Sequence, residues 1–368
     1  MANLLIIFAA TMVLSYWTQY RVLAIRGSRS YASSFCLAAI IVMMSLHCGL
    51  RTAYNDTLVY IKLFLEAPTL AEYLSDGLDL TENPLFGMFQ SLFRHHISEN
   101  YHHFLFVTAL FTISCFVLFI KRYAHDFTFS MMLFFILLYL LPFAAMKQAL
   151  AMALLTIAIT NLLDNRYVSY YILVAVAALF HTYAIVFVIL PVFLARPWTV
   201  IVYAAVAAVA FVIVTFEASI TQLLELSDGF GRDLSTDQLL SEEGMNLFRV
   251  AVYGVPPLIS FVFQNKFRTV ASKPMSLMIN MSVISFLFCC MGAINAANMF
   301  GRSAIYFVFG TIIALPWMIE QVFVQKSVKL MKYVAAICYF AFFIVDTQYF
   351  VDGYRAISVW EFIGSFFG

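Results

Sequence analysis

Runs of apolar residues long enough to cross a lipid bilayer recur along the chain and constrain its fold more than any other feature. A membrane-spanning helix needs roughly 20 such residues. The chain divides into about twelve apolar segments: 2–19, 32–50, 101–120, 127–145, 147–163, 168–180, 182–195, 198–216, 248–264, 274–296, 302–320 and 331–347. Only 11% of the 368 residues are charged, whereas soluble domains have about 25%. The sequence therefore predicts an all-α polytopic membrane protein of about 12 transmembrane helices, forming one integral membrane domain over residues 1–368.

Two of these segments, 168–180 and 182–195, are each too short for a comfortable span. They could form two tilted helices or a re-entrant hairpin. A single helix of 28 residues is the alternative, and it would invert the orientation of everything that follows. The first segment has neither a basic n-region nor a small-x-small cleavage site, so we expect a retained span and not a signal peptide.

The distribution of charge decides the predicted orientation, because cytoplasmic loops carry an excess of Lys and Arg. With an outer N-terminus and twelve crossings, the inner loops contain 13 basic and 3 acidic residues, which leaves 8 basic and 17 acidic residues outside. One merged helix over 168–195 would spoil this asymmetry. We therefore predict that both termini face outward. Long outer segments then cover 51–100 and 217–247, with amphipathic surface helices expected at 84–97 and 220–226.

Several polar residues lie at the ends of spans, where they cost less than the roughly 2.5–3.5 kcal/mol of a charged group near the bilayer centre. Arg51 closes the second span and precedes Asp56 and Tyr60. Arg51 and Asp56 are close enough in sequence to form a pair or to face one cavity. An ordinary loop start with a surface ion pair is equally compatible with this segment.

Lys147 and Gln148 fall in the first turn of a predicted helix that continues to Leu163. The free backbone N–H groups and the helix dipole favour an anion at this position. A lysine there is unfavourable unless an anion or a carboxylate lies nearby. The pair therefore indicates an anion-binding site, and a lysine that reaches to the lipid headgroups is the simpler alternative.

His181 lies inside the longest apolar stretch, between Phe180 and Thr182. A lone histidine in a core is usually a structural residue, but ionisable groups inside membranes are functional candidates by default. An imidazole can act as a base near neutral pH. His181 is therefore a candidate catalytic residue as well as a candidate structural one.

Asn295, Asn298, Arg302 and Tyr306 follow the spacing i, i+3, i+7 and i+11. On a continuous helix these residues form one polar stripe, which Gly301 could interrupt. The stripe suggests the wall of a cavity, and a helix end that faces water is the alternative.

Six of these residues fall on the outer face in the predicted topology: Arg51, Asp56, Lys147, Gln148, His181 and Arg302. Three cations beside a candidate base suit the phosphate or pyrophosphate of a lipid head group. No metal site is expected, because no carboxylate or cysteine completes the histidine pairs at 95–96 and 102–103.

Together these motifs resemble the pattern of the EpsG family of Wzy-type bacterial polysaccharide polymerases. That pattern has an Arg before Asp-x-x-x-Tyr, then an Arg-Gln that opens a helix, Phe-His-x-Ser-Ala, and Arg-x-x-x-Tyr. The matching residues here are Arg51, Asp56, Tyr60, Lys147, Gln148, Phe180, His181, Thr182, Tyr183, Ala184, Arg302 and Tyr306. Two of them depart from the pattern: Lys147 replaces an arginine and loses bidentate binding, and Tyr183 replaces a small serine beside His181.

The resemblance implies transfer of a growing glycan from one undecaprenyl-pyrophosphate carrier onto a new lipid-linked repeat unit. The reaction would take place at the periplasmic or exterior face of the bacterial plasma membrane. It implies an inverting glycosyltransferase that uses no metal or other cofactor. A flippase and a chain-length regulator are candidate partners besides the lipid-linked oligosaccharide and the bilayer, and no nucleic acid is expected.

The resemblance also implies roles for individual residues. Those expected to bind the pyrophosphate are Arg51, Lys147, Gln148, Arg302 and Tyr306. Tyr60 is expected to line the cavity, together with Asn295 and Asn298 from the polar stripe. His181 is the first choice for the base that takes the proton of the acceptor hydroxyl, and Asp56 is the second, unless Asp56 orients Arg51.

The main rival function is transport, either of a lipid-linked sugar by a flippase or of a solute by a twelve-span carrier. A transporter should have polar groups at mid-membrane and two related halves. The halves 1–180 and 181–368 show no clear two-fold relation, and the polar groups gather at span ends. A ligase that moves a finished glycan to another acceptor is a third alternative.

Overall fold

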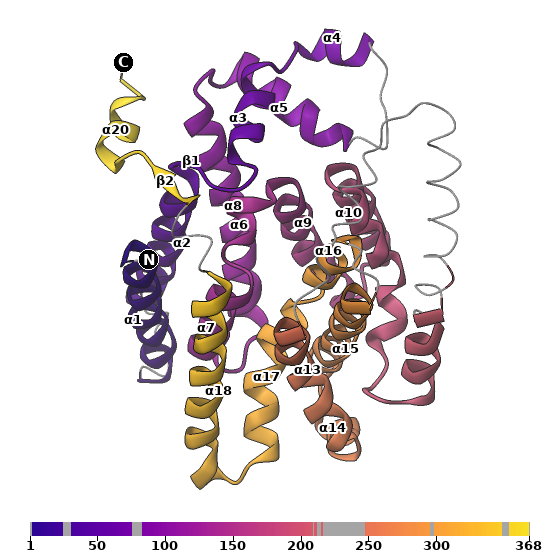
Figure 1. Cartoon of the computed structure of the whole chain (residues 1–368). Helices are drawn as coiled ribbons and strands as arrows, with labels where there is room; N and C mark the ends of the chain where they lie inside the picture. Colours follow the sequence, from indigo (N-terminus) through magenta and orange to yellow (C-terminus); the bar gives the residue numbers. More distant parts are fainter. Residues whose placement is uncertain are drawn as a thin grey trace. The chain divides into compact units, whose positions relative to one another are not determined.

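The computed structural model describes residues 2–24, 31–75, 83–208, 210–211, 215, 247–294, 298–347 and 353–367, and over these the chain is almost entirely helical (Figure 1). Two compact units are present. The first comprises Met1–Val188 with Ala336–Gly368, and the second comprises Ile189–Ala335.

The first unit is built around α6 (Tyr101–Tyr123), which packs against α2 (Tyr31–Gly49) and α9 (Met146–Leu163). Next to these lie α1 (Ala2–Ala24), which contacts α2 and α7, and α10 (Tyr167–Phe180), which contacts α9. The remaining helices of this unit are α3 (Thr57–Leu65), α4 (Leu70–Ser75), α5 (Pro84–His96), α7 (Phe127–Leu137), α8 (Leu141–Ala144), the second half of α18 (Gln325–Asp346) and α20 (Val359–Gly364).

In the second unit, α15 (Lys273–Ile294) packs against α13 (Leu247–Val262), α16 (Asn298–Tyr306) and α17 (Phe309–Val322). The short helix α14 (Gln264–Val270) follows α13. Gly310 explains the close approach of α17 to α15, because a Cβ atom there would lie 2.5 Å from the Met278 carbonyl oxygen. Small residues at such contacts let helix backbones approach closely.

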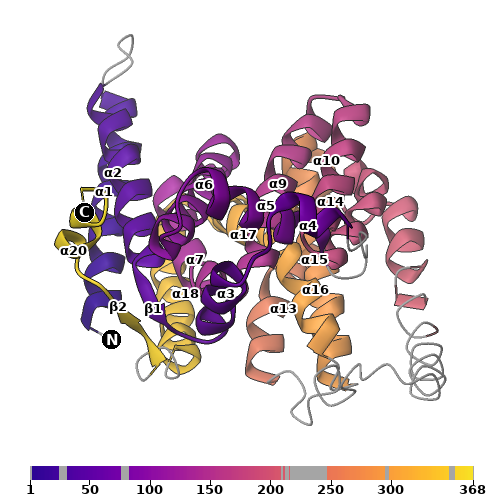
Figure 2. The same cartoon turned by 90° about the horizontal axis from the view of Figure 1, so that it is seen from above.

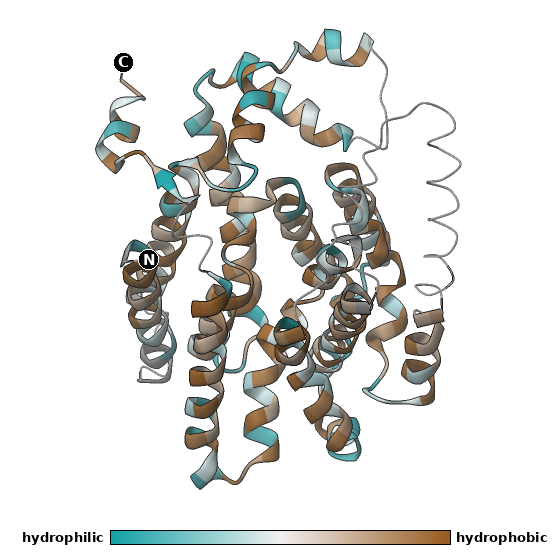
Figure 3. Cartoon of the chain, viewed as in Figure 1, coloured by the Kyte–Doolittle hydropathy of each residue, from teal (hydrophilic) through white to brown (hydrophobic). Residues whose placement is uncertain are grey.

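The structure confirms the predicted all-α polytopic membrane fold, but not the count of twelve spans. In the described part of the chain, five helices are long and apolar enough to cross a membrane, and seven if two bent pairs each count as one span. One bent pair joins α13 to α14 at 79°, and the other joins α16 to α17 at 55°. The predicted straight span at 302–320 is therefore a broken helix. Figure 3 shows the apolar residues that run along these helices.

The segment pair 168–180 and 182–195 folds back on itself. His181 has an extended backbone (φ −158°, ψ 112°) and ends α10, and a 3₁₀ helix, η2 (Thr182–Leu194), follows. The Tyr170 hydroxyl donates a hydrogen bond to the Phe187 carbonyl, which requires α10 and η2 to lie side by side. One merged helix is thereby excluded. The 13 residues of η2 cover about 26 Å at a 3₁₀ rise of about 2 Å per residue, close to the thickness of a bilayer core.

A two-stranded antiparallel ladder is an addition to the predicted all-α fold. It pairs β1 (Arg51–Ala53) with β2 (Arg355–Ala356), and so joins the chain after α2 to the chain after α18. The predicted outer segment 51–100 thus begins with a strand and continues into α3, α4 and α5. The predicted surface helix at 84–97 is present as α5, which lies across the ends of α6 and α9 (Figure 2). The other predicted outer segment, 217–247 with its helix at 220–226, lies outside the described residues except for Leu247.

The loops of the first unit form two groups, one at each end of the unit, and hydrogen bonds or ion pairs join the loops within each group. At one end, the backbone N–H of Thr182 donates to Asn83 Oδ1 (3.0 Å), and His103 Nε2 lies 2.9 Å from Ser365 Oγ. At the other end, Arg122 pairs with Asp164 at 3.2 Å. These are the groups predicted to lie outside and inside, respectively. The outward orientation of the first group stays a prediction from loop charge.

Candidate functional site

Arg51 is a buried cation at the end of α2. Its side chain is 1% exposed. The guanidinium Nε donates to Thr57 Oγ1 (3.1 Å), and Nη1 donates to the Cys48 carbonyl oxygen (2.7 Å). On its far side Nη2 lies 3.7 Å from the sulfur of Met146, the first residue of α9. Arg51 therefore lies directly beneath the start of that helix.

No carboxylate forms an ion pair with Arg51 among the residues that the structure describes. Asp56 is exposed, and Thr57 provides the contact that orients the guanidinium. A buried charge without a counter-ion is costly. Within the described residues, the positive charge of Arg51 thus lies uncompensated under the first turn of α9, where the helix dipole is also positive.

The first turn of α9 presents Lys147 and Gln148. Ala145 separates α8 from α9, because its backbone (φ −125°, ψ 71°) is not helical. Its side chain provides no hydrogen bond to cap α9. Lys147 Nζ lies 5.2 Å from the centroid of the Phe86 ring, a cation–π contact. Gln148 is buried. The positive helix end, Lys147 and the underlying Arg51 together form a cationic place that suits an anionic group.

His181 lies in the sharp turn between α10 and η2. Its backbone N–H donates to the Ala177 carbonyl oxygen (2.9 Å), and its carbonyl oxygen accepts from Ala184 N–H. The imidazole is half-buried and meets the Tyr183 ring edge to face at 5.2 Å. The next residue, Thr182, is tied to Asn83 ahead of α5. This turn is therefore fixed on both sides of the histidine.

One aromatic cluster joins the three sequence motifs of this unit. Its buried members are Tyr60, Phe64, Phe86, Phe93, Phe104, Leu105, Met146 and Leu150, and Phe89 and Phe180 pack against it. Tyr60 comes from the Arg51 motif, Met146 precedes Lys147, and Phe180 precedes His181. The structure thus brings the 51–60, 147–148 and 180–184 motifs together at one end of the unit.

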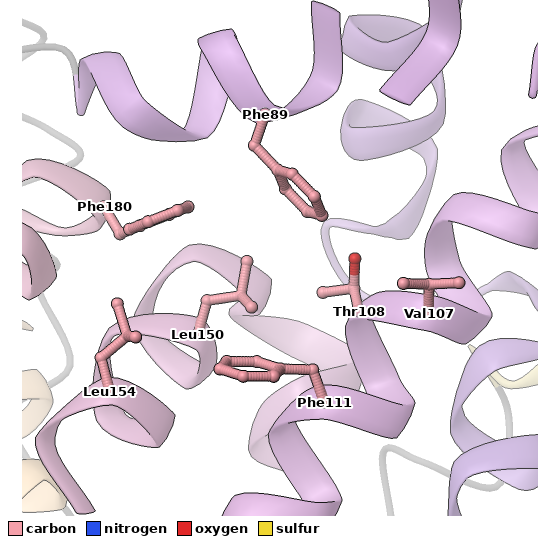
Figure 4. Close-up of a pocket in the computed structure, with 7 residues that line it drawn as sticks. All are labelled: Phe89, Val107, Thr108, Phe111, Leu150, Leu154 and Phe180. Carbon is pink, nitrogen blue, oxygen red and sulfur yellow. The ribbon is translucent and has the colours of Figure 1, made fainter. Parts of the chain in front are cut away.

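A cavity of about 280 Å³ opens next to this cluster (Figure 4). Its lining residues come from α5, α6, α9 and the end of α10, and are Phe89, Val107, Thr108, Phe111, Leu150, Leu154 and Phe180. Thr108 carries the one hydroxyl among them. The cavity is therefore apolar. One of its lining residues, Phe180, immediately precedes His181 in the sequence.

Sequence reasoning missed a group of hydrogen-bonded side chains near the end of α2, which precedes Arg51. Tyr139 OH lies 2.8 Å from His47 Nδ1 and donates to the Met44 carbonyl oxygen (3.1 Å). Tyr354 OH donates to the His47 carbonyl oxygen (2.7 Å). Burial raises the pKa of Tyr354 despite the opposing charge of Arg51, so this hydroxyl remains a donor at neutral pH. No local pattern links Tyr354 to a residue about 300 positions earlier.

The remaining predicted residues belong to the second unit. Arg302 is exposed and Tyr306 is buried, and they lie four residues apart on α16. Gly301 does not interrupt this helix, and the break comes after Tyr306 instead. Asn295 lies outside the described residues, as does the side chain of Asn298. The convergence of Arg302 and Tyr306 with Lys147 and His181 stays a prediction.

Comparison with known proteins supports the resemblance seen in the motifs. No curated protein and no solved structure matches the chain. The model of the EpsG family matches residues 34–359, which include all of the motifs described above. The chain therefore belongs to the EpsG family, whose members are similar to Wzy-type polysaccharide polymerases.

Proposed function

We propose that this protein transfers a growing glycan from one undecaprenyl-pyrophosphate carrier onto a second lipid-linked repeat unit at the outer face of the plasma membrane. Family membership gives a polymerase-like role in polysaccharide synthesis in general terms, and its apolar helices fit a multi-pass inner-membrane protein. The observation that supports the finer proposal is the aromatic cluster. It contains Phe86, which contacts Lys147, and Met146, which contacts Arg51, and Phe180, the neighbour of His181 in sequence, packs against it.

The cationic start of α9 is the proposed site of the pyrophosphate. In the transfer, the bond between the sugar C1 and the pyrophosphate oxygen breaks, and negative charge develops on the leaving oxygen. Lys147 and the N–H groups of the first turn stabilise that charge. Gln148 contributes a polar group, and Arg51 adds its charge from beneath without direct contact. Arg302 and Tyr306 are assigned to the pyrophosphate by the sequence pattern alone.

His181 is the proposed general base. The acceptor hydroxyl attacks C1 from the face opposite the pyrophosphate, so the configuration inverts, and its proton passes to the imidazole. The turn between α10 and η2 fixes the backbone of His181. Asp56 is the second candidate for this role. Tyr60, Asn295 and Asn298 are assigned to the cavity wall.

The site assignment is tested by the length of the polymer made in cells. His181→Ala and Arg302→Ala should abolish long polymer while single lipid-linked repeats persist, because these repeats are the substrate of the transfer step that the variants block. His96→Ala is a matched control, since this histidine is exposed on α5. Wild-type chain lengths in both site variants would overturn the assignment. Mass spectrometry of the product separates polymerisation from ligation to another acceptor.

A further inference from the structure

One face of α9 changes from cationic to apolar within two turns. Lys147, Leu150 and Leu154 are spaced by three and four residues, so they lie on the same face of the helix. Lys147 and Leu154 are seven residues apart, which corresponds to a rise of about 10 Å along the helix. Lys147 sits over Phe86 at the start of the helix, and Leu150 and Leu154 line the cavity. This order suits an amphipathic ligand with an anionic head and a hydrocarbon chain.

The cavity wall formed by α6 is partly exposed. Val107 and Phe111 line the cavity and are 41% and 40% exposed. In a bilayer, an exposed apolar wall of this kind lets a hydrocarbon chain enter without crossing water. Figure 4 shows Phe89 reaching down from α5 opposite Leu150 and Phe111. The cavity is near the lower limit of about 300 Å³ for small-molecule pockets, and so holds part of a long chain.

We propose that this cavity binds the first isoprene units of the polyprenyl carrier, directly below the pyrophosphate. The identity of the carrier rests on the proposed function. The cavity then fixes the depth of the carrier, and with it the position of the sugar C1 relative to His181, which follows the lining residue Phe180. The alternative ligands, a sugar or an ordinary bilayer lipid, are distinguished by the experiment.

The lining argues against a sugar as the ligand. Thr108 is 2% exposed, and its buried hydroxyl has no hydrogen-bond partner within the described part of the chain. The cavity therefore offers a ligand no hydroxyl to bond to. A hydrocarbon chain needs no such bond, so Thr108→Val, which keeps the shape and removes the hydroxyl, should retain binding within about twofold. A loss of roughly tenfold or more would show a ligand that bonds to this hydroxyl and would overturn the proposal.

The experiment uses the full-length protein in phospholipid nanodiscs and a polyprenyl pyrophosphate with a photoreactive diazirine in its second isoprene unit. Mass spectrometry should locate the crosslink on α6 or α9, at residues such as Phe111 and Leu154. Leu154→Trp fills the cavity and should reduce labelling by about tenfold, since contacts with several methylene groups are lost. Ile157→Trp is the matched control on the same helix, because Ile157 is 39% exposed and does not line the cavity.

The crosslinks found in the unmodified protein test the proposal even if a tryptophan variant fails to fold. Crosslinks elsewhere, or equal labelling by a diazirine-bearing diacyl phosphatidylglycerol, would overturn the proposal, as would full labelling of folded Leu154→Trp. Polymer synthesis is measured separately in the same preparation. Synthesis without labelling of the cavity contradicts this inference alone. Labelling of the cavity without synthesis supports the inference and contradicts the proposed polymerase activity.

Discussion

Replacing Arg51 by methionine should abolish polymer formation but leave the protein nearly as stable as the wild type. Arg51 makes two strong hydrogen bonds, to Thr57 Oγ1 and the Cys48 carbonyl oxygen. Hydrogen bonds to charged groups contribute about 1.5–3 kcal/mol each, or ~3–6 kcal/mol for the pair. Burying the guanidinium costs several kcal/mol in return. Methionine removes both contributions, so we expect a net change within about 2 kcal/mol.

Thr57→Val tests the same interaction from the other side, because it leaves the charge of Arg51 in place and removes the hydroxyl that accepts its hydrogen bond. The Thr57 hydroxyl accepts from Arg51 and donates to the Tyr54 carbonyl oxygen at 2.6 Å. Its loss should cost about 2–4 kcal/mol. In an Arg51→Met background the same change should cost only about 1 kcal/mol, because only the bond to Tyr54 remains to be lost. The two residues should therefore show a coupling of about 1–3 kcal/mol.

The measurement is thermal unfolding of the four proteins in detergent, followed by tryptophan fluorescence, with polymer length assayed in cells. Arg166→Met serves as the control, since this arginine is exposed. Two results would refute the reasoning. One is an Arg51→Met variant that is less stable than Thr57→Val. The other is strict additivity in the double variant, which would mean that Thr57 does not support a buried charge.

Three further predictions concern the scaffold. Gly310→Ala should destabilise the second unit by roughly 1–3 kcal/mol, because its Cβ would lie 2.5 Å from the Met278 carbonyl oxygen and the Ser282 nitrogen; an unchanged melting temperature would show that α15 and α17 separate easily. Tyr170→Phe should cost about 1 kcal/mol and increase proteolysis near His181, because it removes the bond to Phe187; unchanged cleavage would contradict a tie between α10 and η2. Hydrogen bonds from Ser358, chiefly from its backbone N–H, lower the pKa of Glu361 below 4.5, so the stabilisation of α20 is present above pH 4.5 and lost as the pH falls through the lowered value. Amide exchange of residues 359–364, corrected for intrinsic rates, should rise at that point in the wild type and not in Glu361→Gln.

Much of the helical framework could be predicted from apolar run length, because hydrophobic spans depend on local composition. The break at His181 could also be predicted, since each flanking segment is short for an α-helical span. The 3₁₀ geometry of η2, which lengthens that segment, has no comparable signal. The bend between α16 and α17 falls at Phe307 and Val308, where neither proline nor glycine marks it.

The site was predictable only in part, for physical reasons that its residues illustrate. Lys147 stands at a helix start, and its position follows from the apolar run behind it. The orientation of Arg51 depends instead on Thr57 and Met146, and Asp56, which has the complementary charge, points to solvent. Long-range packing also decides the contact between Tyr354 and His47, since the β1–β2 ladder brings the two segments together.

The most direct test of polymerase activity is reconstitution of the purified protein in liposomes with an externally supplied undecaprenyl-pyrophosphate-linked repeat unit. Polymerisation predicts a ladder of products spaced by one repeat mass, formed on one side of the membrane, and no ladder with His181→Ala. Movement of intact single repeats across the bilayer without any new glycosidic bond would contradict the proposed function and would identify a transporter.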